Sequence, residues 1–219
     1  YLTVTLTTTT GGDLSATTGA GVTVGCSGTG AMTLTGSTTD LNTYLNTASN
    51  ITYLHGTANR NGDNSDTITV VVNDNGNTGS GGGTNQNLGS VNVDIGAVND
   101  DPINAGTLPT DITVTEDVAS NVDLSAIDLF DVDAGGDNLM VTLSTSTGGN
   151  LTAAASAGIA VGGSAAALTL TGSQTDLNSY LNTASNITYL HGTVNLNGDD
   201  ADTITVVVND NGNTGSGGG

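Results

Sequence analysis

The residues of this chain that are best suited to chemistry are clustered side-chain oxygens. One acidic run is DVDAGGDN at residues 131–138, and a second is VNDDP at residues 98–102. The motif NDNG occurs twice, at residues 73–76 and 209–212, each time at the end of a VVV run. Carboxylates, Asn side chains and backbone carbonyls are the ligands of a hard cation such as Ca²⁺, which takes roughly six to eight oxygens. The clusters therefore predict calcium binding.

A simpler interpretation of NDNG remains open. Asp and Asn are common turn residues, and Asn-Asp-Asn-Gly forms a tight turn without any metal. For NDNG alone we favour turn chemistry. For DVDAGGDN together with VNDDP we favour a cation, because carboxylates that meet without a counter-ion repel one another.

Catalytic chemistry is not expected. His55 and His191 each stand alone after a strand-like run, and Cys26 has no counterpart in the second half of the chain. No G-x-S-x-G motif and no nucleophile with an adjacent base is present. The acids lie in polar Gly/Asn loops rather than in the apolar pockets that raise the pKa of a catalytic carboxyl group. We therefore predict that the chain is not an enzyme.

The charge balance excludes several classes of partner. The 219 residues include 21 acidic residues and one basic residue, Arg60, for a formal net charge of -20. Proteins that bind nucleic acid neutralise phosphates with Lys and Arg, and docking on anionic lipid needs the same residues. No membrane span is expected either. The apolar stretch at 151–170 has a polar counterpart at 14–34, so both are predicted to form strand–turn–strand.

A long internal repeat organises the chain. Residues 66–83 recur without a change at 202–219, an offset of 136. Residues 39–58 recur at 175–194 with 18 of 20 positions the same. The segment from 84 to about 137 occurs once. We therefore expect two modules from a longer array. They are residues 1–101, which lack the first strands, and residues 102–219, which lack the last strand.

The local pattern is that of β-strands. Apolar residues alternate with Thr, Asn or Asp at 2–6 and 91–95, and Ile68, Val70 and Val72 have the same two-residue spacing. Thr and Val suit a pleated, half-buried surface, and clusters of Gly, Asn and Asp separate the runs. This predicts an all-β sandwich or barrel. Residues 39–46 break the pattern and predict a short helix capped by Thr39. Its apolar face would contain Leu41, Tyr44 and Leu45.

The order of these motifs resembles a known family. Within one repeat period the motifs run Glu116, DVDAGGDN, VVVNDNG and then a strand that ends in VNDDP. This is similar to the calcium-binding layout of cadherin repeats, and most of all to the cadherin-like, VCBS-type tandem modules of giant bacterial surface adhesins. The resemblance covers essentially the whole chain. It implies Greek-key, Ig-like β-sandwich modules with a short helical insertion in each, stacked through calcium ions.

The resemblance also implies a set of ligands. At the junction inside this chain they would be Asn99, Asp100, Asp101, Asp131, Asp133, Asp137 or Asn138, and Asp210. Asp74 is the counterpart of Asp210 in the first module. Glu116 and Asp117 would serve the next junction of an array. Cadherins carry an LDRE-type motif in the upstream domain, where this chain reads LHGTANRNGDNSD and offers Asp63 or Asp66.

The function that the resemblance implies is mechanical. The chain would be a calcium-rigidified spacer of a secreted or surface-bound bacterial adhesin, with neighbouring repeats of the same chain as its partners. One alternative is a subunit of a self-assembling extracellular filament or sheath, which would contact other copies. Another is a module that binds a glycan or a protein directly. Glycan sites usually have exposed aromatic residues, and this chain has six aromatic residues in all.

Overall fold

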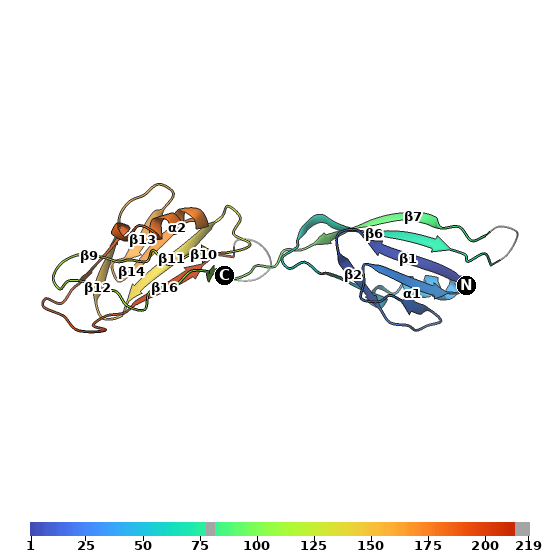
Figure 1. Cartoon of the computed structure of the whole chain (residues 1–219), viewed down its shortest axis with the longest axis horizontal. Coiled ribbons are helices and arrows are strands. Elements are labelled where there is room, and N and C mark those ends of the chain that lie inside the picture. Colours follow the sequence, from blue (N-terminus) through green and yellow to red (C-terminus); the bar gives the residue numbers. More distant parts are fainter. Residues whose placement is uncertain (78–81, 213–219) are drawn as a thin grey trace. The chain divides into compact units, whose positions relative to one another are not determined.

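The computed structural model describes residues 1–77 and 82–212. Contacts divide the chain into two compact units, Tyr1–Ala97 (unit 1) and Val98–Gly219 (unit 2). The boundary lies just before the VNDDP segment, which therefore belongs to unit 2 rather than to the end of the first module, where we had placed it. Each unit is built mainly from antiparallel β-sheets, and the predicted all-β sandwich class is confirmed (Figure 1).

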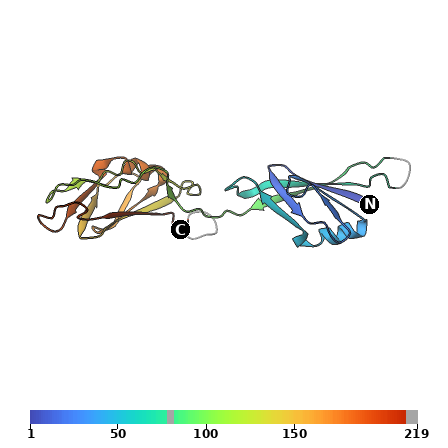
Figure 2. The ribbon, with the colours of Figure 1, turned by 60° about the horizontal axis from the view of Figure 1, so that its bottom comes forward.

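Unit 1 contains a five-stranded sheet in the order β3-β4-β1-β6-β7 and a two-stranded sheet of β2 and β5 (Figures 1 and 2). The strands are β1 (Leu2–Thr8), β2 (Gly12–Ala16), β3 (Thr23–Gly25), β4 (Ala31–Gly36), β5 (Ile51–His55), β6 (Gly62–Asn73) and β7 (Gln86–Ile95). The helix α1 (Thr38–Leu45) and the 3-10 turn η1 (Ala48–Asn50) connect β4 to β5.

The core of unit 1 is formed by the inward-facing residues of these strands. Val4 and Leu6 of β1 lie opposite Leu34 and Met32 of β4. These four side chains are buried together with Leu14 of β2, so both sheets contribute to one core. The apolar residues point inward and the intervening threonines lie on the other face, as the alternation predicts.

The helix α1 forms where the sequence predicted it, but it begins earlier. Its N-cap is Ser37, whose hydroxyl accepts a hydrogen bond from the backbone N–H of Asp40 at 3.1 Å and donates one to the Asp40 carboxylate at 2.6 Å. The prediction that Thr39 caps the helix was therefore wrong, because Ser37 already supplies the hydroxyl. Of the three residues expected on the buried face, two are buried and the third is exposed: Leu41, Tyr44 and Leu45.

Unit 2 has a four-stranded sheet in the order β13-β14-β11-β16, a three-stranded sheet β12-β15-β9 and the pair β10-β8. The strands are β8 (Ile103–Asn104), β9 (Ser120–Asn121), β10 (Leu129–Phe130), β11 (Asn138–Thr145), β12 (Gly149–Ala153), β13 (Ala160–Ser164), β14 (Ala167–Ser173), β15 (Ile187–His191) and β16 (Ile204–Asn209). The helix α2 (Gln174–Leu181) and the turn η2 (Ala184–Asn186) repeat the insertion of unit 1.

The apolar stretch at 151–170 runs through β12, β13 and the first half of β14, so the strand–turn–strand prediction is confirmed. No helix in the described part of the chain has the length and apolar character that a bilayer crossing needs.

One buried carboxylate ties the two sheets of unit 1 together. Asp66 of β6 accepts hydrogen bonds from the backbone N–H groups of Thr9, Thr10 and Gly12 at 2.9, 2.9 and 3.1 Å. It also accepts one from the Tyr53 hydroxyl at 2.8 Å. Burial alone would raise the pKa of Asp66, but these hydrogen bonds and that from Thr67 hold it well below its usual range. The carboxylate of Asp66, which the sequence offered as a calcium ligand, therefore accepts hydrogen bonds that stabilise unit 1.

Unit 2 has the same tie. Asp202 accepts hydrogen bonds from the backbone N–H groups of Ser146, Thr147 and Gly149 and from the Tyr189 hydroxyl, at 2.8 to 3.1 Å. Burial favours the uncharged form of Asp202, yet these hydrogen bonds hold its pKa well below the usual range. Burial, and then the hydrogen bond to Asp202, raise the pKa of Tyr189 to about 12. The duplicated tie fixes the turn before β12 and the start of β16 in unit 2, as Asp66 does for the matching elements of unit 1.

Candidate calcium site

The strands of unit 2 bring the separated acidic motifs to one end of the unit. β16 pairs antiparallel with β11, and Asn209 lies opposite Met140. The end of β16 therefore lies beside the start of β11. Asp210 follows β16 directly, and β11 begins at Asn138, the last residue of DVDAGGDN. NDNG and DVDAGGDN thus meet because of the strand pairing.

The VNDDP segment is held at the same place by two hydrogen bonds. The side-chain amide of Asn99 donates to Oδ2 of Asp210, which is 111 positions away in the sequence. The backbone N–H of Asp100 donates to Oδ2 of Asp133 at 2.6 Å. The structure therefore brings together residues from all three motifs that the sequence had singled out.

Asp131 is the most unusual residue of this cluster. Its side chain is only 6% exposed, and its Oδ1 accepts hydrogen bonds from the backbone N–H groups of Asp133 and Ala134 at 2.8 and 3.0 Å. Its Oδ2 is buried and has no hydrogen-bond partner among the described residues. A buried polar atom without a partner costs about 1–3 kcal/mol, and more when it is charged. A cation at this oxygen would remove that cost, so the residues present fit a bound metal ion.

Asp210 is wholly buried, at 0% exposed. Its Oδ1 accepts a hydrogen bond from the backbone N–H of Gly212 at 3.0 Å, and its Oδ2 accepts the one from Asn99. These hydrogen bonds, Gly212 first, hold the pKa of Asp210 below its usual range. The carboxylate therefore remains charged at neutral pH in a buried position, as a cation ligand must.

The rest of the predicted set lies on the same loops but is more exposed. Asp101, Asp137 and Asn138 are exposed, and Asp133 is half-buried. No three His, Cys, Asp or Glu side chains within residues 1–77 and 82–212 form a group that could hold a metal ion by themselves. Calcium also takes Asn, backbone carbonyl and water oxygens. The site that these residues could form is therefore a mixed oxygen site.

Gln174 is a contributor that the sequence reasoning missed. It is the first residue of α2, and its Oε1 accepts a hydrogen bond from the backbone N–H of Asp131 at 2.9 Å. This contact fixes the start of the acidic loop against the helix. The sequence did contain a signal: the two copies are nearly identical here, yet the position of Gln174 is occupied by Thr38 in the first copy.

The first copy of NDNG forms a turn, and its Asn75 side chain donates hydrogen bonds to the Tyr1 carbonyl and the Thr3 hydroxyl, both at 3.2 Å. Asp74 is exposed, and its Oδ1 accepts a hydrogen bond from the backbone N–H of Gly76 at 3.1 Å. The Asn73 side chain accepts one from the backbone N–H of Asn75 at 2.6 Å. Asp74 belongs to unit 1, whereas all the other predicted ligands belong to unit 2.

Glu116 and Asp117 lie at the opposite end of unit 2. Glu116 accepts a hydrogen bond from the Asn197 side chain at 2.8 Å, and Asp117 accepts one from the backbone N–H of Asn195 at 3.0 Å. Both partners are in the loop that precedes β16, whereas Asp210 follows this strand. Six strand residues span about 20 Å. The two acids are thus separate from the Asp131 cluster, and their use at another junction stays a prediction.

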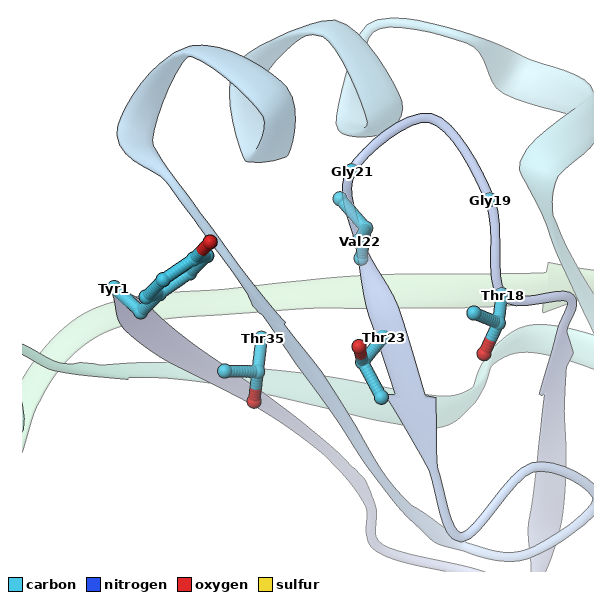
Figure 3. A pocket seen from close by; sticks show the side chains of 7 residues that line it. All are labelled: Tyr1, Thr18, Gly19, Gly21, Val22, Thr23 and Thr35. Carbon is cyan, nitrogen blue, oxygen red and sulfur yellow. The ribbon is translucent and has the colours of Figure 1, made fainter.

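Unit 1 has a surface hollow of about 470 Å³, which is a place to look for the glycan site of the alternative function. Figure 3 shows the ring of Tyr1 on one side and a glycine-containing turn on the other. The described lining residues are Tyr1, Thr18, Gly19, Gly21, Val22, Thr23 and Thr35. They include a single aromatic ring and no charged side chain, which gives a sugar ring little to stack on.

Comparisons with protein-family models, with curated proteins and with solved structures found no significant match for this chain. The resemblance to cadherin-like repeats therefore rests on the motifs alone.

Proposed function

We propose that this chain is a calcium-binding structural repeat of an extracellular surface protein. The observation that carries the proposal is the buried Asp131 carboxylate oxygen that has no hydrogen-bond partner among the described residues. It lies in a loop that contacts a second acidic segment through Asp133 and Asp100. A chain with a net charge of -20 draws cations to such a place.

The residues that would hold the ion are Asp131, Asp133 and Asp210, with oxygens of Asn99 to Asp101 from the VNDDP segment. Their chemistry suits Ca²⁺, which prefers carboxylate, amide and carbonyl oxygens in flexible arrangements. The ion would supply charge neutralisation and cross-linking rather than catalysis. It would satisfy the buried oxygen of Asp131 and offset the repulsion between the acids.

The mechanical consequence concerns the segment that connects the two units. β7 ends at Ile95, and Asn99 and Asp100 are already hydrogen-bonded to unit 2. An ion shared by VNDDP and the acidic loop would hold this segment more tightly and leave few free residues after β7. In a tandem array, the same device at each junction would stiffen the chain into a spacer for an adhesive protein on the bacterial cell surface. Extracellular calcium modules bind at about 10⁻⁴–10⁻³ M, which suits such a location.

Thermal unfolding of the full chain in Ca²⁺, in Mg²⁺ and in chelator tests this proposal. A ligand present at 100 times its Kd stabilises the folded state by about 2.7 kcal/mol. The unfolding midpoint of unit 2 is therefore expected to rise by several degrees in Ca²⁺ and to rise less in Mg²⁺. Asp131→Asn should abolish the rise, whereas the matched variant Asp74→Asn should keep it. An unchanged midpoint for the wild-type chain in Ca²⁺ would contradict the proposal.

A further inference from the structure

The short strand β10, which lies directly before Asp131, is held on both of its edges. On one edge it pairs antiparallel with β8, so that Phe130 lies opposite Ile103 and Leu129 opposite Asn104. On the other edge it contacts the helix α2 (Figure 1). Strands in globular proteins usually have about 3–10 residues. A strand of two residues therefore depends on such neighbours for its position.

Asn178 of α2 pairs with β10 as a neighbouring strand would. Its Oδ1 accepts a hydrogen bond from the backbone N–H of Leu129 at 2.8 Å, and its Nδ2 donates one to the backbone carbonyl of Leu129 at 2.9 Å. Nδ2 also donates to Oδ1 of Asp128 at 3.0 Å. A single side-chain amide thus satisfies both backbone polar groups of Leu129.

Gln174 continues this contact along the same edge. It lies four positions before Asn178, so the two side chains share one face of α2. Its Oε1 accepts the hydrogen bond from the backbone N–H of Asp131 at 2.9 Å. Alternate residues of an extended segment present their N–H groups to the same edge. The two amides of α2 therefore hold Leu129 and Asp131 in a line, up to the first residue of the acidic loop.

The VNDDP segment depends on the same strand. Residues 98–102 lead directly into β8 at Ile103, and the acidic loop leaves β10 directly after Phe130. Because Ile103 and Phe130 lie opposite one another, the two segments meet at the same end of the strand pair. The backbone N–H of Ala105 continues the pairing by donating to the Asp128 carbonyl at 2.7 Å. A displacement of β10 would move both sets of expected ligands.

The helix itself does not need these amides in order to form. In unit 1, α1 has the same length and the same serine N-cap, although Thr38 occupies the position of Gln174. Asn42 occupies the position of Asn178 and is exposed, as is Thr38. Gln174 and Asn178 are half-buried against the β10 edge. Their contacts therefore serve the acidic loop rather than the helix.

We propose, on the basis of the function proposed above, that Asn178 and Gln174 are positioning residues of the ion site. They hold the two ligand-bearing segments in the binding arrangement before the ion binds, and they set its affinity without touching it. Oδ2 of Asp131 is buried and has no hydrogen-bond partner among the described residues, so movement of the loop toward water would relieve its cost. The hydrogen bonds from α2 oppose that movement.

Isothermal titration calorimetry of the full chain with Ca²⁺ is the test. Loss of a group that orients metal ligands weakens binding by about 10–100-fold. Asn178→Ala and Gln174→Thr should therefore each raise the Kd for Ca²⁺ by about ten-fold or more. Gln174→Glu keeps an acceptor for the Asp131 N–H and should bind at least as tightly as the wild-type chain. Asn42→Ala, at the equivalent exposed position of α1, should leave the Kd unchanged.

Hydrogen exchange in chelator separates positioning from general stability. The amides of Leu129 in Asn178→Ala and of Asp131 in Gln174→Thr should exchange faster, while those of β11 keep their wild-type rates. Gln174→Thr introduces the residue that α1 already carries, so it keeps the test open if Asn178→Ala does not fold. A wild-type chain that binds Ca²⁺ no more tightly than both variants would overturn the positioning role alone. A wild-type chain that binds no Ca²⁺ would overturn the proposed function and the positioning role together.

Discussion

Residues 66–76 and 202–212 have the same sequence, yet the two copies end in different structures. In both, the first carboxylate oxygen of the NDNG aspartate accepts a hydrogen bond from the following glycine, at 3.1 Å for Asp74 and 3.0 Å for Asp210. Asp74 is otherwise exposed, whereas Asp210 is buried and is held by Asn99. The motif itself therefore encodes a turn, and the residues that surround it decide whether the turn becomes part of a cation site.

The same two copies differ along the strand before the turn. β6 pairs with β7, whereas β16 has no strand on its second edge within residues 1–77 and 82–212. The strand β7 lies just after the first copy of the repeated sequence. The duplicated sequence thus forms the same strand and turn in both units.

The largest expected effect concerns a feature that the two units share. Asp66→Asn and Asp202→Asn each remove a carboxylate that accepts several hydrogen bonds, at a cost of about 2–4 kcal/mol. The depressed pKa values mean that the ties contribute fully above the unfolded-state pKa of about 4 and weaken as pH falls below it. Chemical denaturation between pH 2 and pH 7 measures both effects.

Each Asn variant should lose that acid-dependent part of the stability of its own unit. Equal losses in the two units would support a shared structural role. A loss in only one unit would show that the ties are not equivalent.

The next largest effect distinguishes the NDNG aspartate of unit 2 from that of unit 1. In chelator, Asp210→Ala removes the acceptor for Asn99 and Gly212 and should destabilise unit 2 by about 1–3 kcal/mol. Asp74 lies on the surface, so Asp74→Ala should lower the free energy of unfolding of unit 1 by only about 0.5 kcal/mol. Denaturant titration of both variants gives the comparison. Similar costs would mean that burial of Asp210 contributes nothing beyond the turn.

A smaller effect of unusual sign is expected at Asp131. In chelator, Asp131→Asn replaces a buried carboxylate oxygen that lacks a hydrogen-bond partner by a neutral amide, so unit 2 should gain about 1 kcal/mol or stay unchanged. The same substitution should remove stabilisation by Ca²⁺. Asp133→Asn is the control for this sign in chelator, because the Asp133 carboxylate already accepts a hydrogen bond from the backbone N–H of Asp100. A clear loss of stability for Asp131→Asn in chelator would show that the carboxylate is satisfied without an ion.

The smallest effect tests the strand edge. Val71→Thr introduces a hydroxyl beneath β7 and should cost unit 1 about 1 kcal/mol. Val207→Thr changes an exposed side chain and should cost unit 2 only a few tenths of a kcal/mol. Thermal unfolding at low protein concentration is the measurement. Equal costs would mean that β16 is covered as β6 is.

The sequence predicted the strands and the helical insertion because apolar alternation and helix caps are local signals. It also singled out DVDAGGDN and VNDDP, which the structure brings together through Asp133 and Asp100. It did not distinguish Asp74 from Asp210, because identical residues carry no information about different surroundings. It also missed the Asp66 and Asp202 ties, which include backbone N–H donors as far as 57 and 56 residues away in the sequence. Backbone donors leave no signature in the residue types.

Titration of ¹⁵N-labelled chain with Ca²⁺, followed by amide chemical shifts, tests the central claim most directly. The backbone N–H groups of Gly212 and Gly76 occupy the same position in the two NDNG turns, so each is the control for the other. The account predicts that Gly212, Asp133 and Ala134 shift together along one saturable curve while Gly76 stays in place. Equal shifts at both glycines, or none at either, would contradict a specific calcium site in unit 2.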